Sequence, residues 1–335
     1  MQALSEAQFH AATEGGVPDP EPITDDLWSV AVPAPGDLLD YTLSAIHVGD
    51  DGAVTIVDPG WESPEMHARL DSALAALGRS VADIRYLVVT HAHPDHIGAA
   101  DALRRASGAT LLVHEREEAG LDRARAGHLE DPSGTVSDWG APGDAQDRLV
   151  AQLTRTREGP ALPAPADVLL RDGERLPVPG FACEILPTPG HTEGHICLVD
   201  RERGLILTGD HVLPTVFPGL GLGIGADPGD GNPITAYLAS LDRIAPYDAF
   251  DVVPGHGYRF RGLGSRRQEL SDHVHRRADE VAGALAADPD ASTWQVASRL
   301  TWSAGWEALS TGAWLGSALM QTGLYVDFVR TSRSG

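Results

Sequence analysis

The 335-residue chain contains only two cysteines, Cys183 and Cys197. That number is too small for a disulfide framework in a chain of this length, so we expect two reduced core thiols, with a single bridge between them left open. Basic residues are also scarce: 25 lysines and arginines stand against 48 aspartates and glutamates, a formal net charge of −23. Because phosphate backbones are bound largely through Lys and Arg, this balance argues against nucleic acid as a partner.

Long apolar runs are absent as well. No stretch approaches the roughly 20 apolar residues of a membrane span. The opening MQALSEAQFHAATEGG lacks the basic and apolar regions of a secretory signal. These absences favour a cytoplasmic protein with no membrane partner. Hydrophobic residues at 42% and charged residues at 22% are ordinary for a globular chain, so we expect the chain to fold.

The chain divides into three parts by pattern. Residues 1–26 are polar and end in VPDPEPITDD, which predicts a loose N-terminal arm. Residues 27–263 alternate β-branched runs with stretches of helical apolar spacing, which predicts layers of helix on sheet. Within them, about 115–166 is charged and Ala-rich and predicts a helical insertion, either a lid or a decorative hairpin.

Residues 264–335 predict a small, mostly helical C-terminal subdomain. Its tryptophans are expected to be core anchors of this unit, with a pocket wall or a dimer face as the alternative. They are Trp294, Trp302, Trp306 and Trp314. A homodimer is therefore left open.

The segment THAHPDHIG, residues 90–98, crowds titratable groups directly after the apolar run YLVV. His91 and His93 are two positions apart, so an extended chain turns both side chains to one face. Asp95 and His96 follow in the turn into the next helix. Neutral imidazole and carboxylate suit zinc, iron or manganese, and this one segment can therefore serve two metal ions.

Matching residues elsewhere also end apolar runs beside glycine: His191 in TPGHTEGH, Asp210 in LILTGDH and His256 in VVPGHG. Such turns let side chains reach a shared sheet edge without crowding. His195 and His211 adjoin these positions, and a supporting or substrate role is open for each. The remaining histidines are interpreted as ordinary packed or polar residues: His10, His47, His67, His114, His128, His273 and His275.

In this order the residues resemble the metallo-β-lactamase fold hydrolase superfamily, over roughly residues 27–258. The set that carries the resemblance is Asp58, His91, His93, Asp95, His96, His191, Asp210 and His256. The resemblance implies an α+β, four-layer αββα sandwich with the metals at one edge. It implies that His91, His93 and His191 bind one metal, that Asp95, His96 and His256 bind the second, and that Asp210 bridges them. Asp58 would support a ligand imidazole or its loop by hydrogen bonds.

The resemblance also implies two divalent metal ions, with zinc expected first and iron or manganese as alternatives. Two cations about 3.5–4 Å apart can hold a water and lower its pKa, giving a bridging hydroxide that attacks a carbonyl. Asp95 or Asp210 would carry the proton to the leaving group. Tyr258, two residues past His256, is a candidate oxyanion donor.

For the substrate, Asp210 with the complete HxHxDH set resembles the glyoxalase II, lactonase and ribonuclease Z groups. Residues 213–233 are apolar and glycine-rich and are expected to line an acyl pocket. We therefore expect a small-molecule thioester, ester or lactone with an apolar acyl group. Phosphodiester cleavage, suggested by a loose resemblance of the tail to winged-helix-like domains, and amide hydrolysis of the β-lactamase kind are alternatives. A binding protein with a vestigial site is disfavoured by the complete ligand set.

Overall fold

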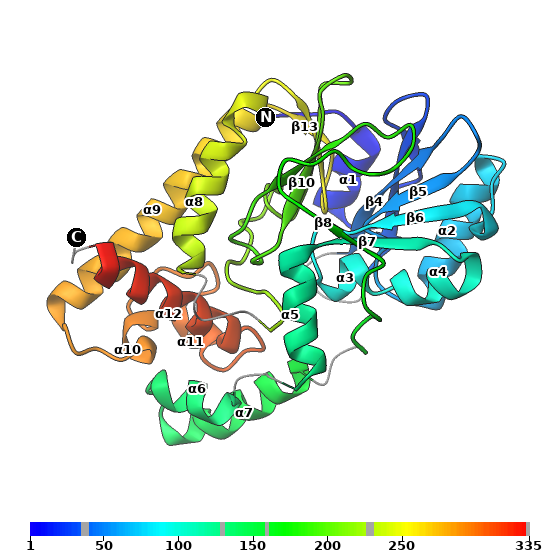
Figure 1. The fold of residues 1–335 in the computed structure, drawn as a ribbon. Coiled ribbons are helices and arrows are strands. Elements are labelled where there is room, and N and C mark those ends of the chain that lie inside the picture. The colour runs from blue at the N-terminus through cyan, green and yellow to red at the C-terminus, as the bar shows by residue number, and fades with distance from the viewer. Residues whose placement is uncertain (35–39, 128–130, 158–160, 226–230, 333–335) are drawn as a thin grey trace.

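The computed structural model describes residues 1–34, 40–127, 131–157, 161–225 and 231–332. Two β-sheets lie face to face, with helices α2 and α4 outside one sheet and α8 and α9 outside the other (Figure 1). The expected four-layer αββα sandwich is confirmed.

The first sheet has seven strands. In spatial order they are β2 (Glu21–Pro22), β3 (Leu27–Pro33), β4 (Tyr41–Val48), β5 (Val54–Val57), β6 (Ile84–Val88), β7 (Thr110–His114) and β8 (Val168–Leu170). Pairing is antiparallel from β2 to β5 and parallel from β5 to β8. The outer face is covered by α2 (Pro64–Ala76) and α4 (Ala100–Ser107), with η1 (Val81–Asp83) leading into β6. Helix α2 begins where the Ser63 side chain accepts the Met66 N–H at 3.1 Å, and it buries Met66, Leu70 and Leu74.

The second sheet has six strands. In spatial order they are β1 (Gln2–Ala3), β13 (Phe260–Arg261), β12 (Asp251–Pro254), β11 (Leu205–Gly209), β10 (Ile196–Asp200) and β9 (Glu184–Pro187). Only β11 and β12 are parallel; they are joined through α8 (Pro233–Arg243) and η2 (Ala245–Tyr247). Helix α9 (Leu263–Ala287) lies beside α8 on the same outer face (Figure 1).

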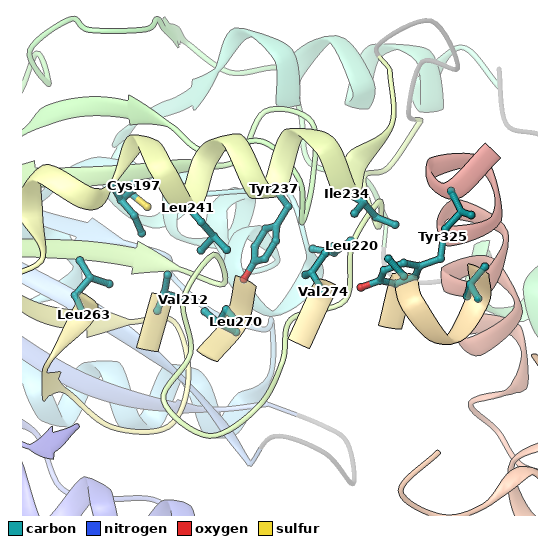
Figure 2. Close-up of a cluster of buried hydrophobic side chains, with 14 of the residues drawn as sticks. Cys197, Val212, Leu220, Ile234, Tyr237, Leu241, Leu263, Leu270, Val274 and Tyr325 are labelled. Atoms are coloured by element: carbon teal, nitrogen blue, oxygen red, sulfur yellow. The ribbon is translucent and has the colours of Figure 1, made fainter. Parts of the chain in front are cut away.

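Successive residues of a strand point alternately into the core between the two sheets and into the core beneath the outer helices. Leu198 of β10 faces the other sheet, while its neighbours Cys197 and Val199 pack under α8 and α9. Figure 2 shows this outer core, in which Tyr237 and Leu241 of α8 meet Leu263 and Leu270 of α9. Strands buried on both faces explain the nearly continuous apolar runs in the sequence. Because α9 shares this core, the first part of the expected C-terminal subdomain is the fourth layer of the sandwich.

The expectation of a loose arm over residues 1–26 is wrong. Strand β1 pairs with β13 and β2 pairs with β3, so both sheets gain an edge strand from this segment. Between them, α1 (Glu6–Glu14) buries Gln8, whose amide donates to Ser29 Oγ at 2.9 Å and accepts the Arg259 N–H at 3.0 Å. A strand of two residues is too short to show an alternating apolar pattern in the sequence. A buried polar residue with all its hydrogen bonds formed cannot be told from a surface residue by its identity alone.

The expected insertion at 115–166 divides into two parts. Helix α5 (Glu115–Arg125) packs against β7 and β8 and places Leu121 in the core, so it belongs to the sandwich. The helices α6 (Pro132–Asp138) and α7 (Gly143–Arg157) instead contact the C-terminal helices (Figure 1).

These C-terminal helices are α10 (Thr293–Ala297), α11 (Trp306–Leu309) and α12 (Leu315–Ser332), and we call them, together with α6 and α7, the helical cap. Leu149 of α7 and Leu319 of α12 are fully buried in its core. Trp294, Trp302 and Trp306 pack against this core, as expected, whereas the side chain of Trp314 is 53% exposed. Residues 264–332 contain helices and no strand, so the described part of the tail lacks the wing of a winged-helix domain.

Both cysteines are buried and unbridged, in agreement with their assignment as core thiols. Across the described ranges, no helix combines the length and the apolar character needed to cross a membrane.

Candidate metal centre

The predicted ligands converge at one edge of the sandwich, each from the end of a strand. His91 and His93 follow β6, and His93 caps α3 (Pro94–Ile97). Asp210 follows β11 and His256 follows β12. Close approach is possible because position 255 is glycine: a Cβ there would lie 2.5 Å from Asp210 Oδ1.

The first group of donor atoms comprises His91, His93 and His191. Nδ1 of His93 lies 2.9 Å from Nε2 of His91 and 3.1 Å from Nε2 of His191. A second group comprises Asp95, His96 and His256. Nε2 of His256 lies 3.2 Å both from Nε2 of His96 and from Asp95 Oδ2. Both groups match the ligand sets expected from the sequence.

Asp210 lies between the two groups. Its Oδ1 is 3.4 Å from Nε2 of both His96 and His256, and its Oδ2 is 3.7 Å from Nε2 of His191. Oδ1 is buried and forms no hydrogen bond within the described part of the chain. A buried carboxylate oxygen left in this way needs a cation or a proton beside it.

Each ligand imidazole is fixed by a hydrogen bond on its far nitrogen. His96 Nδ1 donates to Asp58 Oδ2 at 3.0 Å, His256 Nδ1 to Tyr41 O at 2.7 Å, and His191 Nδ1 to Gly219 O at 2.7 Å. These bonds leave Nε2 of each ring, with its lone pair, facing the cluster.

The other two rings follow the same rule. His93 Nε2 donates to Leu222 O at 2.9 Å, so His93 faces the cluster through Nδ1. His91 Nδ1 lies 3.1 Å from Thr90 Oγ1, which leaves Nε2 for the cluster. Two ring nitrogens whose lone pairs face each other at about 3 Å repel unless a cation or a proton lies between them. This donor set therefore fits divalent metal ions.

The electrostatics of the two groups differ. Burial, with the neighbouring His93, lowers the pKa of His191 to about 4, so this imidazole is neutral and able to bind a metal. Burial also acts to lower the pKa of His256, but the Asp210 carboxylate outweighs it and raises that pKa to about 10. Positive charge, as protons or as a cation, is therefore strongly favoured around Asp210.

Asp58 connects the cluster by hydrogen bonds to the segment that follows β6. Its Oδ1 accepts the Thr90 N–H and its Oδ2 accepts the Thr90 hydroxyl, both at 2.8 Å, in addition to the bond from His96. The backbone of Asp58 has φ of 55°, an uncommon conformation for a residue other than glycine. The expected supporting role of Asp58 matches these contacts.

Glu117 is a supporting residue that the sequence analysis missed. It lies in the first turn of α5, where Oε2 accepts the Ala92 N–H and Oε1 accepts the Gly194 N–H, both at 2.9 Å. Oε1 also accepts the Thr192 hydroxyl. One buried carboxylate thus joins the segment of His91 and His93 to that of His191. Its neighbours Glu115 and Glu118 make it look like one of a run of surface acids.

His195 forms a hydrogen bond with the backbone of Asp210. Its Nε2 accepts the Asp210 N–H at 3.1 Å, and its Nδ1 donates to Thr188 Oγ1 at 2.9 Å. His211 is also buried, its ring 4.9 Å from that of Tyr237. Burial lowers the pKa of His211 to about 3, so it is uncharged.

The structure does not place Tyr258 in the cluster. Its ring packs edge-on against Phe9 of α1, with centroids 5.2 Å apart, and it belongs to the core under α8 and α9. Among the described residues, no contact joins its hydroxyl to a ligand, so the expected oxyanion donor is a packing residue. Its closeness to His256 in sequence was misleading because the chain reverses at Gly257.

The expected acyl-pocket segment, 213–233, is described except for residues 226–230. Its carbonyls at Gly219 and Leu222 hold His191 and His93, so the segment forms a wall of the metal centre. Six of the seven histidines interpreted as ordinary residues lie outside the ligand groups. The seventh, His128, lies outside the described residues.

Comparisons with known proteins identify the family of the chain. The family model of the metallo-beta-lactamase superfamily matches residues 42–256. The chain is 26% identical over 286 residues to a probable metallo-hydrolase, YqjP, of Bacillus subtilis (strain 168), covering 79% of this chain and 82% of that protein. It is 28% identical over 217 residues to the hydroxyacylglutathione hydrolase GloC of Haemophilus influenzae, covering 62% and 82%.

A solved structure extends the similarity to the tail. A metallo-beta-lactamase family protein from Thermus thermophilus superposes with a TM-score of 0.76 at 27% identity, covering 93% of this chain and 95% of that one. Some other relatives are matched over only 33% to 59% of their own length.

Proposed function

Because the chain belongs to the metallo-β-lactamase superfamily of hydrolases, we propose that it uses two divalent metal ions to hydrolyse a thioester, ester or lactone with an apolar acyl group. The observation that carries the proposal is the position of Asp210. One of its oxygens faces His96 and His256 and the other faces His191, as a carboxylate bridging two cations would.

In this proposal His91, His93 and His191 hold one ion, and Asp95, His96 and His256 hold the other. The chemistry that two divalent cations supply in such a site is polarisation of a carbonyl oxygen and a lowered pKa of the attacking water. Asp58, Glu117 and His195 position the ligands, so the donor atoms need little rearrangement when the ions bind.

Asp95 is the better of the two candidate proton carriers. Its side chain is 25% exposed, against 9% for Asp210, so Asp95 can reach both the site and the solvent. Burial acts to raise the pKa of Asp95, but His96 and His256 hold it below its usual range, which keeps the carboxylate ionised. Asp210, enclosed by the two groups, has no such access.

The substrate class rests on two supports. The relative GloC is named a hydroxyacylglutathione hydrolase, which favours a thioester. The segment that contacts His191 and His93 through the carbonyls of Gly219 and Leu222 is apolar and glycine-rich, with the sequence GLGLGIG at residues 219–225. A net charge of −23 disfavours RNA or DNA as the substrate.

The test combines elemental analysis with a panel of substrates at equal concentration: thioesters and lactones of increasing acyl length, a chromogenic cephalosporin and a chromogenic phosphodiester. We expect about two metal ions per chain and the highest kcat/KM on an acyl substrate, with activity abolished by a chelator and restored by zinc, iron or manganese. Preferential phosphodiester or cephalosporin cleavage would replace the proposed substrate class. A folded protein that took up no metal would overturn the proposal.

A further inference from the structure

A separate cavity of about 210 Å³ lies between α8, α9, α12 and residues 217–220. Figure 2 shows part of its lining, with Tyr237 reaching from α8 toward Leu270 and Tyr325 reaching from α12 toward Val274. No residue assigned above to metal binding or proton transfer lines this cavity. It is therefore separate from the metal centre.

The walls of the cavity are largely aromatic. Tyr237, Trp302 and Tyr325 line it, and Phe217 closes one side, stacked on His273 with centroids 3.7 Å apart and planes at 10°. A dry apolar cavity of about 150 Å³ is large enough to bind benzene. A cavity of about 210 Å³ therefore accommodates one aromatic ring with a short polar extension.

The polar groups of the lining favour an anion. Arg277 lies over the Trp302 ring at 4.6 Å and donates through Nη1 to Glu280 at 2.9 Å. Its other donors form no hydrogen bond with the described residues. The hydroxyl of Tyr325, a buried residue, is likewise without a partner among them. Burial raises the pKa of Tyr325 to about 12, so the hydroxyl keeps its proton and can donate it.

Charged groups of both signs lie around the cavity, since Arg277 pairs with Glu280 and Arg266 pairs with Glu269, each at 2.9 Å. Burial, followed by Arg277 and Arg276, lowers the pKa of His273 to about 4. Arg266 lies 5.0 Å from the Phe217 ring centroid. A guanidinium and a phenol that both line one cavity are hydrogen-bond donors suited to a carboxylate.

We propose that the cavity binds a small monoaromatic carboxylate, with the ring enclosed by Phe217, Leu270 and Trp302 and the carboxylate bound by Arg277 and Tyr325. The site shares a wall with the metal centre. Gly219 and Leu220 line the cavity, the Gly219 carbonyl accepts from His191, and the Leu220 N–H donates to Gln321 Oε1 at 3.1 Å. The proposal does not depend on which bond the metal centre cleaves.

The test is calorimetric titration of the metal-loaded protein with 3-phenylpropanoate and with its neutral amide, 3-phenylpropanamide. We expect the carboxylate to bind about tenfold or more tightly than the amide, since a hydrogen bond to a charged group is worth roughly this factor. Arg277→Gln should weaken binding of the carboxylate by about tenfold. Arg276→Gln, an exposed neighbour outside the lining, should leave it within about twofold.

Tyr325→Phe is the second variant, because it removes only a hydroxyl and preserves the shape of the cavity. It should weaken binding of the carboxylate while leaving the thermal unfolding midpoint nearly unchanged. Equal binding in wild type and Arg277→Gln would overturn the proposal. Binding that is lost in Asp210→Asn but kept in Arg277→Gln would place the ligand on the metals and also overturn it. Absence of binding to the wild-type protein would do the same.

Discussion

The backbone N–H of Gly194 donates to Glu117 Oε1 at 2.9 Å. The two backbones also lie close together, because a Cβ at position 194 would lie 2.3 Å from the Glu117 backbone nitrogen. The first turn of α5 is therefore pressed against the loop that carries His191. Through this contact Glu117 positions the candidate metal ligands without being a ligand itself.

Replacement of Glu117 by glutamine should weaken the metal centre without unfolding the protein. Glutamine keeps the shape of the side chain, but its NH₂ group cannot accept a hydrogen bond from both backbone N–H groups. We expect metal affinity or kcat/KM to fall by about tenfold to hundredfold, the usual effect of removing such a partner. Glu115→Gln is the control, since Glu115 is exposed on the same helix. Equal metal content and activity in both variants would contradict the assigned role.

Gly194→Ala should destabilise the fold. The added methyl group meets backbone atoms of Arg116 and Glu117, which cannot move aside as a flexible side chain would. We expect the free energy of unfolding to fall by about 1–3 kcal/mol, measured by denaturant titration at fixed metal concentration. Gly283→Ala is the matched control, because nothing lies within 4 Å of a Cβ there and the site is inside α9. That variant should gain about 0.5–1 kcal/mol.

Asp58→Asn tests the orientation of His96. Asparagine tolerates a positive φ, so the turn should persist, while the acceptor for His96 Nδ1 loses its charge. We expect loss of metal from the group of Asp95, His96 and His256, by about tenfold to hundredfold in affinity, seen as a fall in metal per chain at limiting metal. Unchanged loading and activity, equal to the exposed-site variant Asp51→Asn, would rule out this role.

Asp210→Ala removes the carboxylate that faces both groups. We expect a larger loss than for the supporting residues, with metal content reduced and kcat/KM lowered by more than about hundredfold. Elemental analysis and the substrate panel measure both quantities. A variant with full metal content and full activity would exclude Asp210 as the bridge.

A pH effect is expected at His47, outside the metal centre. Burial lowers the pKa of His47, so below about pH 6.5 the unfolded chain takes up a proton that the folded chain does not. This contribution to stability is present above about pH 6.5 and is lost as the pH falls below it. His47→Gln should therefore reduce the decline in the free energy of unfolding between about pH 6.5 and 5, whereas exposed His10→Gln should not. Identical pH profiles for wild type and His47→Gln would refute the prediction.

The convergence of the candidate metal ligands could be predicted from the sequence, because each candidate lies at the end of an apolar run and the fold brings these strand ends to one edge. Four of the seven come from a single segment, residues 91–96. The four layers followed from the alternation of strand and helix patterns. Residues that act through their own side chains at strand ends are thus visible in a single sequence.

The residues that were missed or misplaced act through the backbone of distant segments. Glu117 bonds to N–H groups 25 and 77 positions away, and backbone donors leave no trace in residue identity. The short strands at residues 2–3 and 21–22 are stabilised by pairing with neighbours rather than by their own pattern. Tyr258 was misplaced because nearness in sequence does not say which way a side chain points after a turn.

The shared core of the helical cap has a consequence for biosynthesis. Leu149 and Leu319 are buried against one cluster although about half the chain separates them. Helices α6 and α7 cannot cover their apolar face until α12 has left the ribosome, while the strands that carry the metal ligands are already complete. The nascent protein is therefore expected to pass through a stage in which the strands that carry the candidate metal ligands are complete and the apolar faces of α6 and α7 are still exposed to chaperones and proteases.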